Sequence, residues 1–321
     1  MNRVESRNLA RKLAPLLWLA FMGAAAWVLT HRLRATDFGE ILRQLASLPL
    51  SALVIATACS TGTYALVGIY EGMAVRLATG QRMRAYAFRT AVTANPIARS
   101  IGFAIVSGGA LRYRMYAAQG LSLPRIGAVI VLVAMPYFFA VGWLIDLSVL
   151  LNIEQASAAL RLPPTLLVAL GVAGLAKDIG WLVFLWLRKE PITLLKRSIP
   201  LPGPKHGLAQ IAFGLAEISL MTTTLYVLMP PELELSWPAF VAIYCLAFIA
   251  GQLSNVPAGL GVLEAALLLM LPHVPPAKLV GAVLAYRAVY EVLPLLVALV
   301  LLLVYEAAHP SGLVRGRANR P

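Results

Sequence analysis

Charged residues are scarce in this chain. Only 13% of its 321 residues are Asp, Glu, Lys or Arg, whereas soluble domains average about 25%. Hydrophobic residues make up 60% of the chain and the mean hydropathy is +0.79. This composition excludes an ordinary soluble protein. It predicts an all-α integral membrane protein, built as a polytopic bundle of helices.

Residues with catalytic or ligating chemistry are also few. The two cysteines, Cys59 and Cys245, fall inside apolar runs, and the four histidines stand near segment ends or in loops. The glycine-rich stretches lack the Lys-Ser/Thr pair of a phosphate-binding loop and the third glycine of a dinucleotide fingerprint. We therefore predict no catalytic residues, no metal site and no cofactor.

The basic residues predict a topology. The chain reads as one transmembrane domain over residues 1–321. With both termini in the cytoplasm, 18 of the 27 Lys and Arg fall in cytoplasmic segments, 5 outside and 4 in membrane segments. This is the positive-inside bias, so the net charge of +13 indicates membrane topology and not nucleic-acid binding. The predicted membrane segments are 13–30, 50–70, 84–111, 126–151, 165–187, 208–229, 237–271 and 279–305. A short interfacial helix is predicted over 37–48.

Two of these segments, 84–111 and 237–271, are interrupted by polar and helix-breaking residues. Each carries an Asn followed by a Pro, at Asn95-Pro96 and at Asn255 and Pro257. Irregular backbone at membrane depth is tolerated only where it is buried in protein or lines a wet cavity. We expect a break at each site and a re-entrant hairpin in each segment. The predicted topology gives the hairpins opposite orientations, as in transporters built from an inverted repeat.

Several charges fall inside the apolar segments, where each unpaired charge costs about 3 kcal/mol. Arg287 and Glu291 are four residues apart, so they can meet on one helix face. They form either a structural ion pair or a phosphate-binding arginine with its orienting carboxylate. Glu71, near a span end, is expected to reach the interface. Further candidate cavity charges are Arg99, Lys177, Asp178 and Glu217, and adjacent Lys177 and Asp178 are expected to engage different partners.

Three stretches together resemble a known family. They are Ser107–Tyr116 (SGGALRYRMY), Ser254–Glu264 (SNVPAGLGVLE) and Tyr286–Pro294 (YRAVYEVLP). In this order they resemble the membrane region of lysylphosphatidylglycerol synthases, the multiple peptide resistance factors. This chain has Ala258 where the family pattern has a glycine. Carried over by position, the substrate-binding candidates are Arg112, Arg114, Asn255, Pro257, Gly259, Gly261, Glu264, Arg287 and Glu291.

The resemblance implies a phospholipid flippase-like transporter of a bacterial cytoplasmic (inner) membrane. Its substrate would be an anionic phospholipid such as phosphatidylglycerol or its aminoacylated derivatives. The resemblance does not extend to the cytosolic synthase domain, so we do not expect aminoacyl-lipid synthase activity. The alternatives are a non-catalytic subunit or scaffold of a separate lipid synthase, and an enzyme acting on lipid headgroups. The expected partners are anionic phospholipids, with a separate synthase and homo-oligomerisation left open.

Overall fold

A computed structural model describes residues 22–34, 38–101, 104–187, 192–194, 197–199 and 204–308. Helices account for nearly all of these residues. Five helices in this part of the chain are long and apolar enough to cross a membrane, by length and composition: Leu50–Thr79, Leu123–Leu151, Pro164–Phe184, Lys205–Tyr226 and Pro276–Ala307. The prediction of an all-α membrane protein is therefore confirmed.

The N-terminal elements include the first interrupted segment. A helix at 22–33 covers the described end of the predicted span 13–30, whose first residues lie outside the described part. The predicted interfacial helix is α2 (Phe38–Ala46), and the next span is α3 (Leu50–Thr79), nine residues longer than predicted. Two packed helices, α4 (Arg84–Ile101) and α5 (Ala104–Ala118), then form a hairpin.

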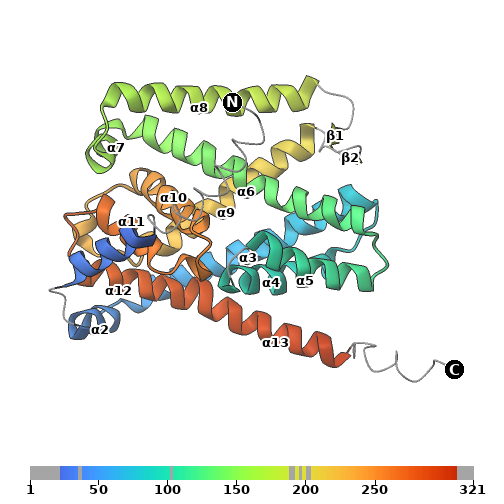
Figure 1. Cartoon of the computed structure of the whole chain (residues 1–321), viewed down its shortest axis with the longest axis horizontal. Coiled ribbons are helices and arrows are strands. Elements are labelled where there is room, and N and C mark those ends of the chain that lie inside the picture. The colour runs from blue at the N-terminus through green and yellow to red at the C-terminus, as the bar shows by residue number, and fades with distance from the viewer. Residues whose placement is uncertain are drawn as a thin grey trace, which may run out of the picture.

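The middle of the chain contributes two long spans and their connections. These are α6 (Leu123–Leu151) and α8 (Pro164–Leu187), joined by the short helix α7 (Ile153–Leu160). A small antiparallel hairpin follows, with β1 (Ile192–Leu194) paired to β2 (Arg197–Ile199). In Figure 1, α8 lies along one edge of the molecule and is covered mainly by α6.

The C-terminal part contains the second interrupted segment. After α9 (Pro204–Tyr226) and η1 (Pro231–Leu233), α10 (Trp237–Leu253) packs against α11 (Val262–Met270) across the one-turn helix η2 (Pro257–Gly259). The last span is continuous but irregular: α12 (Pro276–Arg287), a π-helical turn η3 (Ala288–Val292) and α13 (Leu293–Ala308). A π turn widens the helix locally and is common at functional sites.

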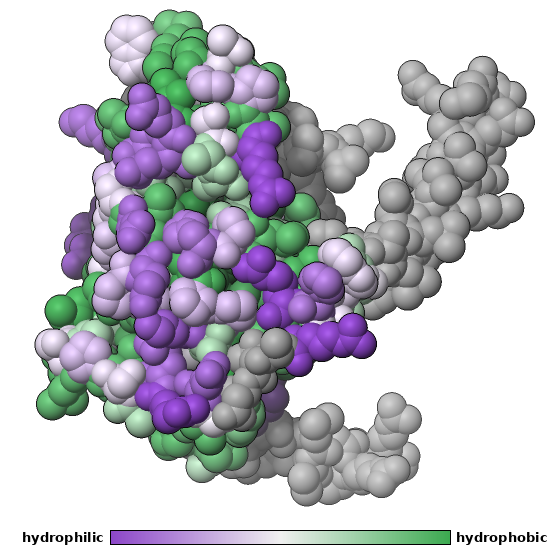
Figure 2. Space-filling view, turned by 90° about the vertical axis from the view of Figure 1, so that its left-hand side faces the viewer, coloured by the Kyte–Doolittle hydropathy of each residue, from purple (hydrophilic) through white to green (hydrophobic). Residues whose placement is uncertain are grey.

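The two helical hairpins lie towards opposite ends of the long axis and meet in the interior. Figure 1 places α10 and α11 near the left-hand end, with α4 and α5 extending to the right. Between them, α4 packs against η2 at the break of the second hairpin. The left-hand end carries hydrophilic side chains over much of its surface, as Figure 2 shows. Re-entry of the hairpins into a bilayer and an inverted repeat stay predictions.

The break predicted at Asn95-Pro96 was wrong. The helix α4 continues through Pro96 to Ile101, and the next helix, α5, begins at Ala104. Proline removes one backbone N–H, but a helix packed on several sides can hold its shape at that point. Here α4 packs against α3, α5 and α13. The break predicted in the second hairpin is confirmed.

Candidate functional site

The first buried charge cluster joins the α4–α5 hairpin to α3. Arg112 on α5 donates to both carboxylate oxygens of Glu71, from Nε to Oε1 at 3.0 Å and from Nη2 to Oε2 at 2.7 Å. Asn95 accepts a bond from the same guanidinium at 3.2 Å, and the Tyr116 hydroxyl donates to Glu71 at 2.9 Å. Glu71 has no exposed surface. Two-pronged Arg–carboxylate geometry is the strongest ion-pair arrangement, so this cluster fixes α5 to α3.

The second cluster closes the break in the other hairpin. Arg287 at the end of α12 donates to Glu264 on α11, from Nε to Oε1 at 2.6 Å and from Nη2 to Oε2 at 3.0 Å. It also reaches Glu291 at 2.9 Å and the carbonyl oxygens of Ala258 and Gly259 at 2.9 and 3.4 Å. The predicted contact between Arg287 and Glu291 is confirmed. Through these bonds, one guanidinium satisfies backbone carbonyls that the interrupted helix leaves without helical partners.

The backbone of the break needs glycine at two of its positions. Gly259 and Gly261 have φ of 61° and 81°, a region that residues with a Cβ rarely adopt. A Cβ on Gly259 would lie 3.1 Å from the Cα of Gly251, where α10 approaches the break. The amide of Gly261 donates to Glu264 at 2.9 Å and so caps the start of α11. The two glycines therefore allow the kinked backbone of this break.

A third cluster lies in the interior, around Arg99 near the end of α4. Its Nη2 is 3.6 Å from Oε1 of Glu217 on α9, and its guanidinium lies over the rings of Phe248 and Tyr290 at 5.7 and 5.6 Å. The other oxygen of Glu217 accepts a bond from the Tyr70 hydroxyl at 2.9 Å. Arg99 of α4 is thus surrounded by side chains from α9, α10 and η3, and α3 joins the cluster through the bond of Tyr70 to Glu217. Arg99 keeps 19% of its side chain exposed, and Glu217 only 2%.

The three arginines differ in how completely they are bonded. Arg112 and Arg287 each hold a carboxylate with two bonds shorter than 3.1 Å. Arg99 has one longer ion contact and two ring faces. A guanidinium carries five N–H donors, so Arg99 has the largest unused capacity of the three. Among them it is the best placed to receive an anion without first breaking a strong ion pair.

Three predicted candidates lie elsewhere. Arg114 pairs with Glu306 at 2.6 Å with 52% of its side chain exposed. Lys177 and Asp178 do not engage different partners as predicted: Lys177 Nζ bonds Asp178 Oδ1 at 3.0 Å. The pair lies against Gly142 of α6, where an added Cβ would be 3.2 Å from Lys177 Nζ.

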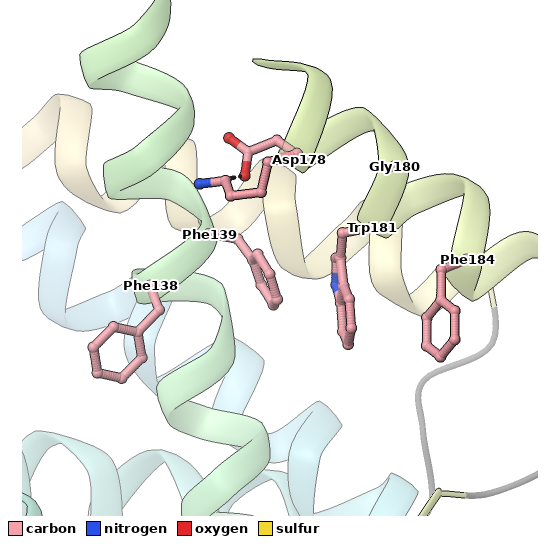
Figure 3. A pocket seen from close by; sticks show the side chains of 7 residues that line it. Phe138, Phe139, Asp178, Gly180, Trp181 and Phe184 are labelled. Carbon is pink, nitrogen blue, oxygen red and sulfur yellow. Dashed lines mark ion pairs between the residues drawn. The ribbon is translucent and has the colours of Figure 1, made fainter. Parts of the chain in front are cut away.

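Lys177 and Asp178 line a separate groove of about 420 Å³ between α6 and α8. Figure 3 shows the rings of Phe138, Phe139, Trp181 and Phe184 along this groove, with the ion pair at one end. Phe139 stacks on Trp181, and Trp181 on Phe184, at centroid distances of 5.2 and 5.3 Å. The groove belongs to the outer side of the bundle and is distinct from the Arg99 cluster.

The sequence failed to identify part of the site. Glu71 was expected to reach the interface but is fully buried against Arg112, because α3 extends beyond the predicted span end. Asn95 was noted only as a helix breaker, yet it bonds Arg112. Tyr70 and Phe248 carry no sequence signal, since an aromatic residue in an apolar helix usually packs in the core. Within the described residues no His, Cys, Asp or Glu group suits a metal ion.

Comparison with known proteins finds two similar chains, one of which is named as an inner membrane protein. An uncharacterised protein of Synechocystis sp., slr0712, is 34% identical over 200 residues, which cover 62% of this chain and 62% of that protein. The inner membrane protein YbhN of Escherichia coli is 26% identical over 315 residues, 94% of this chain and 93% of that protein. No family model matches the chain. The resemblance to lysylphosphatidylglycerol synthases therefore stays a prediction.

Proposed function

We propose that this protein is a flippase-like transporter that moves an anionic phospholipid, such as phosphatidylglycerol or a derivative, between membrane leaflets. Its similarity to an inner membrane protein along almost the whole chain supports a bacterial inner membrane location. The observation that carries the proposal is Arg99, a cation between two helical hairpins that lacks a short ion pair. Charged residues inside membrane proteins are costly and most often mark the path of a polar substrate.

Arg99 suits the phosphate of a lipid headgroup. A guanidinium can donate to two phosphate oxygens at once, and it is more weakly hydrated than an ammonium group. The headgroup would pass through the bundle at Arg99 while the acyl chains stay in the surrounding lipid. Arg112 and Arg287 hold the hairpins in shape through their carboxylates, and their predicted binding of substrate stays a prediction.

The described conformation corresponds to an occluded state in this mechanism. The cavity beside the break, lined by Phe248, Gly259, Tyr286 and Glu291 among others, has a volume of only about 30 Å³. That is space for about one water molecule and not for a headgroup. Transport would therefore require the α4–α5 hairpin and the η2 break to separate, first towards one leaflet and then towards the other. Hairpins of opposite orientation, with both termini cytoplasmic, would provide the two openings.

The test is lipid translocation in proteoliposomes. Fluorescent phosphatidylglycerol in both leaflets is bleached from outside, and the fraction of dye that becomes accessible reports movement between leaflets. We expect the protein to raise this fraction above that of empty vesicles, and Arg99→Gln to abolish the gain. Arg89→Gln is the matched control, because Arg89 lies on the same helix with an exposed side chain. Equal translocation by Arg99→Gln and the unaltered protein, at equal incorporation, would refute the proposal.

A further inference from the structure

Two buried tyrosine hydroxyls beside Arg99 make no hydrogen bond with the residues that the structure describes. They belong to Tyr290 on η3 and Tyr137 on α6. The Tyr290 ring lies under the Arg99 guanidinium, and the Tyr137 ring packs on Phe248, the other ring that Arg99 covers, at a centroid distance of 5.9 Å. A buried hydroxyl without a partner is unfavourable, because no hydrogen bond offsets its desolvation. The hydroxyls of Tyr137 and Tyr290 and the free N–H groups of Arg99 are therefore hydrogen-bond donors without an acceptor among the described residues.

The counter-ion of Arg99 is the carboxylate of Glu217. The positive charge of Arg99 stabilises the ionised form of this carboxylate. Glu217 is 2% exposed and has one neutral donor, Tyr70, apart from the 3.6 Å contact with Arg99. The titratable groups that interact with Glu217 are Tyr64 and Tyr70 from α3, Arg99 from α4, Tyr137 from α6 and Tyr290 from η3. Of these, Arg99 is the cation.

Within the described residues, Arg99 is the cation that acts on Glu217, and the charged groups nearby on the other helices have partners of their own. Tyr244 on α10 and Tyr286 on α12 bond each other through their hydroxyls at 2.8 Å, and Cys245 on α10 is buried. On α8, Lys177 is engaged with Asp178. Glu291, whose carboxylate also acts on Arg99, bonds Arg287. An anion that draws Arg99 away would therefore leave Glu217 as a poorly compensated buried charge.

We infer that Arg99, Tyr137 and Tyr290 form a binding site for a phosphate-type anion, and that Glu217 takes up one proton when the anion binds. The inference rests on the proposed function and deepens it, because it couples substrate binding to protons. Two negative charges sharing one cation at low dielectric cannot both remain ionised at little cost. Neutral Glu217 releases Arg99 to the anion, and the anion in turn favours neutral Glu217. By linkage the two effects are equal in size.

The first experiment measures the binding of short-chain phosphatidylglycerol to the whole purified protein in detergent, by calorimetry across pH. Phosphatidylglycerol suits this test because its phosphodiester keeps one charge throughout. Uptake of one proton makes the affinity fall about tenfold for each unit of rising pH, over the range where only the complex holds the proton. Buffers of different ionisation enthalpy count the proton directly, and the expected uptake is close to one.

Variants assign the proton. Glu217→Gln is expected to bind phosphatidylglycerol without proton uptake and without pH dependence. Glu306→Gln is the control and keeps both, because Glu306 pairs with Arg114 at the other side of the fold. Proton uptake that persists in Glu217→Gln, or binding by the unaltered protein that does not vary with pH, overturns the inference. Sulfate, whose charge is also constant, separates a lipid site from a site for free anions: equal affinity for sulfate would assign a free anion.

Two further variants do not depend on altering a charge. Tyr290→Phe and Tyr137→Phe each remove a hydroxyl without a described partner, so melting temperatures should stay the same or rise. Each should nonetheless weaken phosphatidylglycerol binding several-fold. Unchanged affinity in both variants overturns the anion site. Failure of the inference and failure of the proposed function remain distinct. If the protein translocates lipid but binding does not vary with pH, only the proton-coupling inference fails. If binding is coupled to a proton but no lipid is translocated, only the proposed transport function fails.

Discussion

A double-mutant cycle at Arg112 and Glu71 tests whether this pair braces the first hairpin. Arg112→Met leaves a fully buried carboxylate with one remaining donor, the Tyr116 hydroxyl. Breaking a buried pair from one side costs about 3–5 kcal/mol. Glu71→Leu leaves the guanidinium buried with Asn95 as its remaining partner, at a similar cost. If the two effects were independent, the double variant would lose about 6–10 kcal/mol.

The double variant should lose much less, because neither charge remains. What is left unpaired is neutral, namely Oδ1 of Asn95 and the hydroxyl of Tyr116, at about 1–3 kcal/mol each. We therefore expect a total loss of about 2–6 kcal/mol and a coupling energy of several kcal/mol. This is far above the average of about 0.6 kcal/mol for a hydrogen bond between membrane helices. The larger value reflects a charged, two-pronged contact with no exposed carboxylate surface.

The assay is reversible unfolding in mixed micelles with increasing dodecyl sulfate, followed by circular dichroism. The control cycle uses Arg114 and Glu306, whose side chains are 52% and 29% exposed. An exposed pair of this kind should show a coupling of about 0–1 kcal/mol. Additive losses at Arg112 and Glu71, or equal coupling in the two cycles, would refute the bracing argument.

Three further predictions follow from single features. Gly261→Leu should impair lipid translocation much more than Leu267→Ala at equal expression, because φ at Gly261 is 81°; equal activity of the two variants contradicts this. For topology, cysteines replacing the exposed residues Gln119 and Glu234 in a Cys59→Ser, Cys245→Ser background should react with impermeant thiol reagents from opposite sides, cytoplasmic for Gln119. Labelling of both from one side contradicts the predicted topology. In the loop before α10, a hydrogen bond from Lys278 lowers the pKa of Glu232 below 4.5. Because the folded pKa is lowered, the pair stabilises the fold above pH 4.5 and the effect disappears as the pH falls through the lowered pKa. The melting temperatures of Glu232→Gln and the unaltered protein should therefore converge in acid, and a constant difference would contradict this.

Hydrophobicity allowed the helices of this protein to be predicted well. In the described part of the chain, the existence of the helices and most of their ends agree within a few residues, since long apolar runs and their basic flanks are local properties. The break between α10 and α11 was also predictable, because Pro257, Gly259 and Gly261 each act on the backbone at their own position. The i, i+4 contact of Arg287 with Glu291 follows from helix geometry alone.

The contacts between distant segments were not predictable in the same way. Glu71 and Arg112 are 41 residues apart, and Arg99 and Glu217 are 118 apart, so no local spacing relates either pair. The effect of Pro96 on α4 was not predictable either, because it depends on what surrounds the helix and not only on the missing N–H. The contact of Lys177 with Asp178 also differs from the expectation that these neighbours engage different partners. For charged residues far apart in the chain, the sequence identified the residues but not their partners.

The unequal pairing of the three arginines is an argument about function. A fold that needed only to neutralise its buried charges would give Arg99 the short, two-pronged partner that Arg112 and Arg287 have. Here, Arg99 lies where the first hairpin packs near the break of the second, with a 3.6 Å ion contact and two hydroxyls beside it that have no hydrogen-bond partner among the described residues. Each of these features lowers the stability of the empty protein, and each is relieved by one anion at the same place. Residues that destabilise the unliganded protein in this way are expected at binding sites. A bound ligand supplies the missing interactions, and their free energy favours the liganded state.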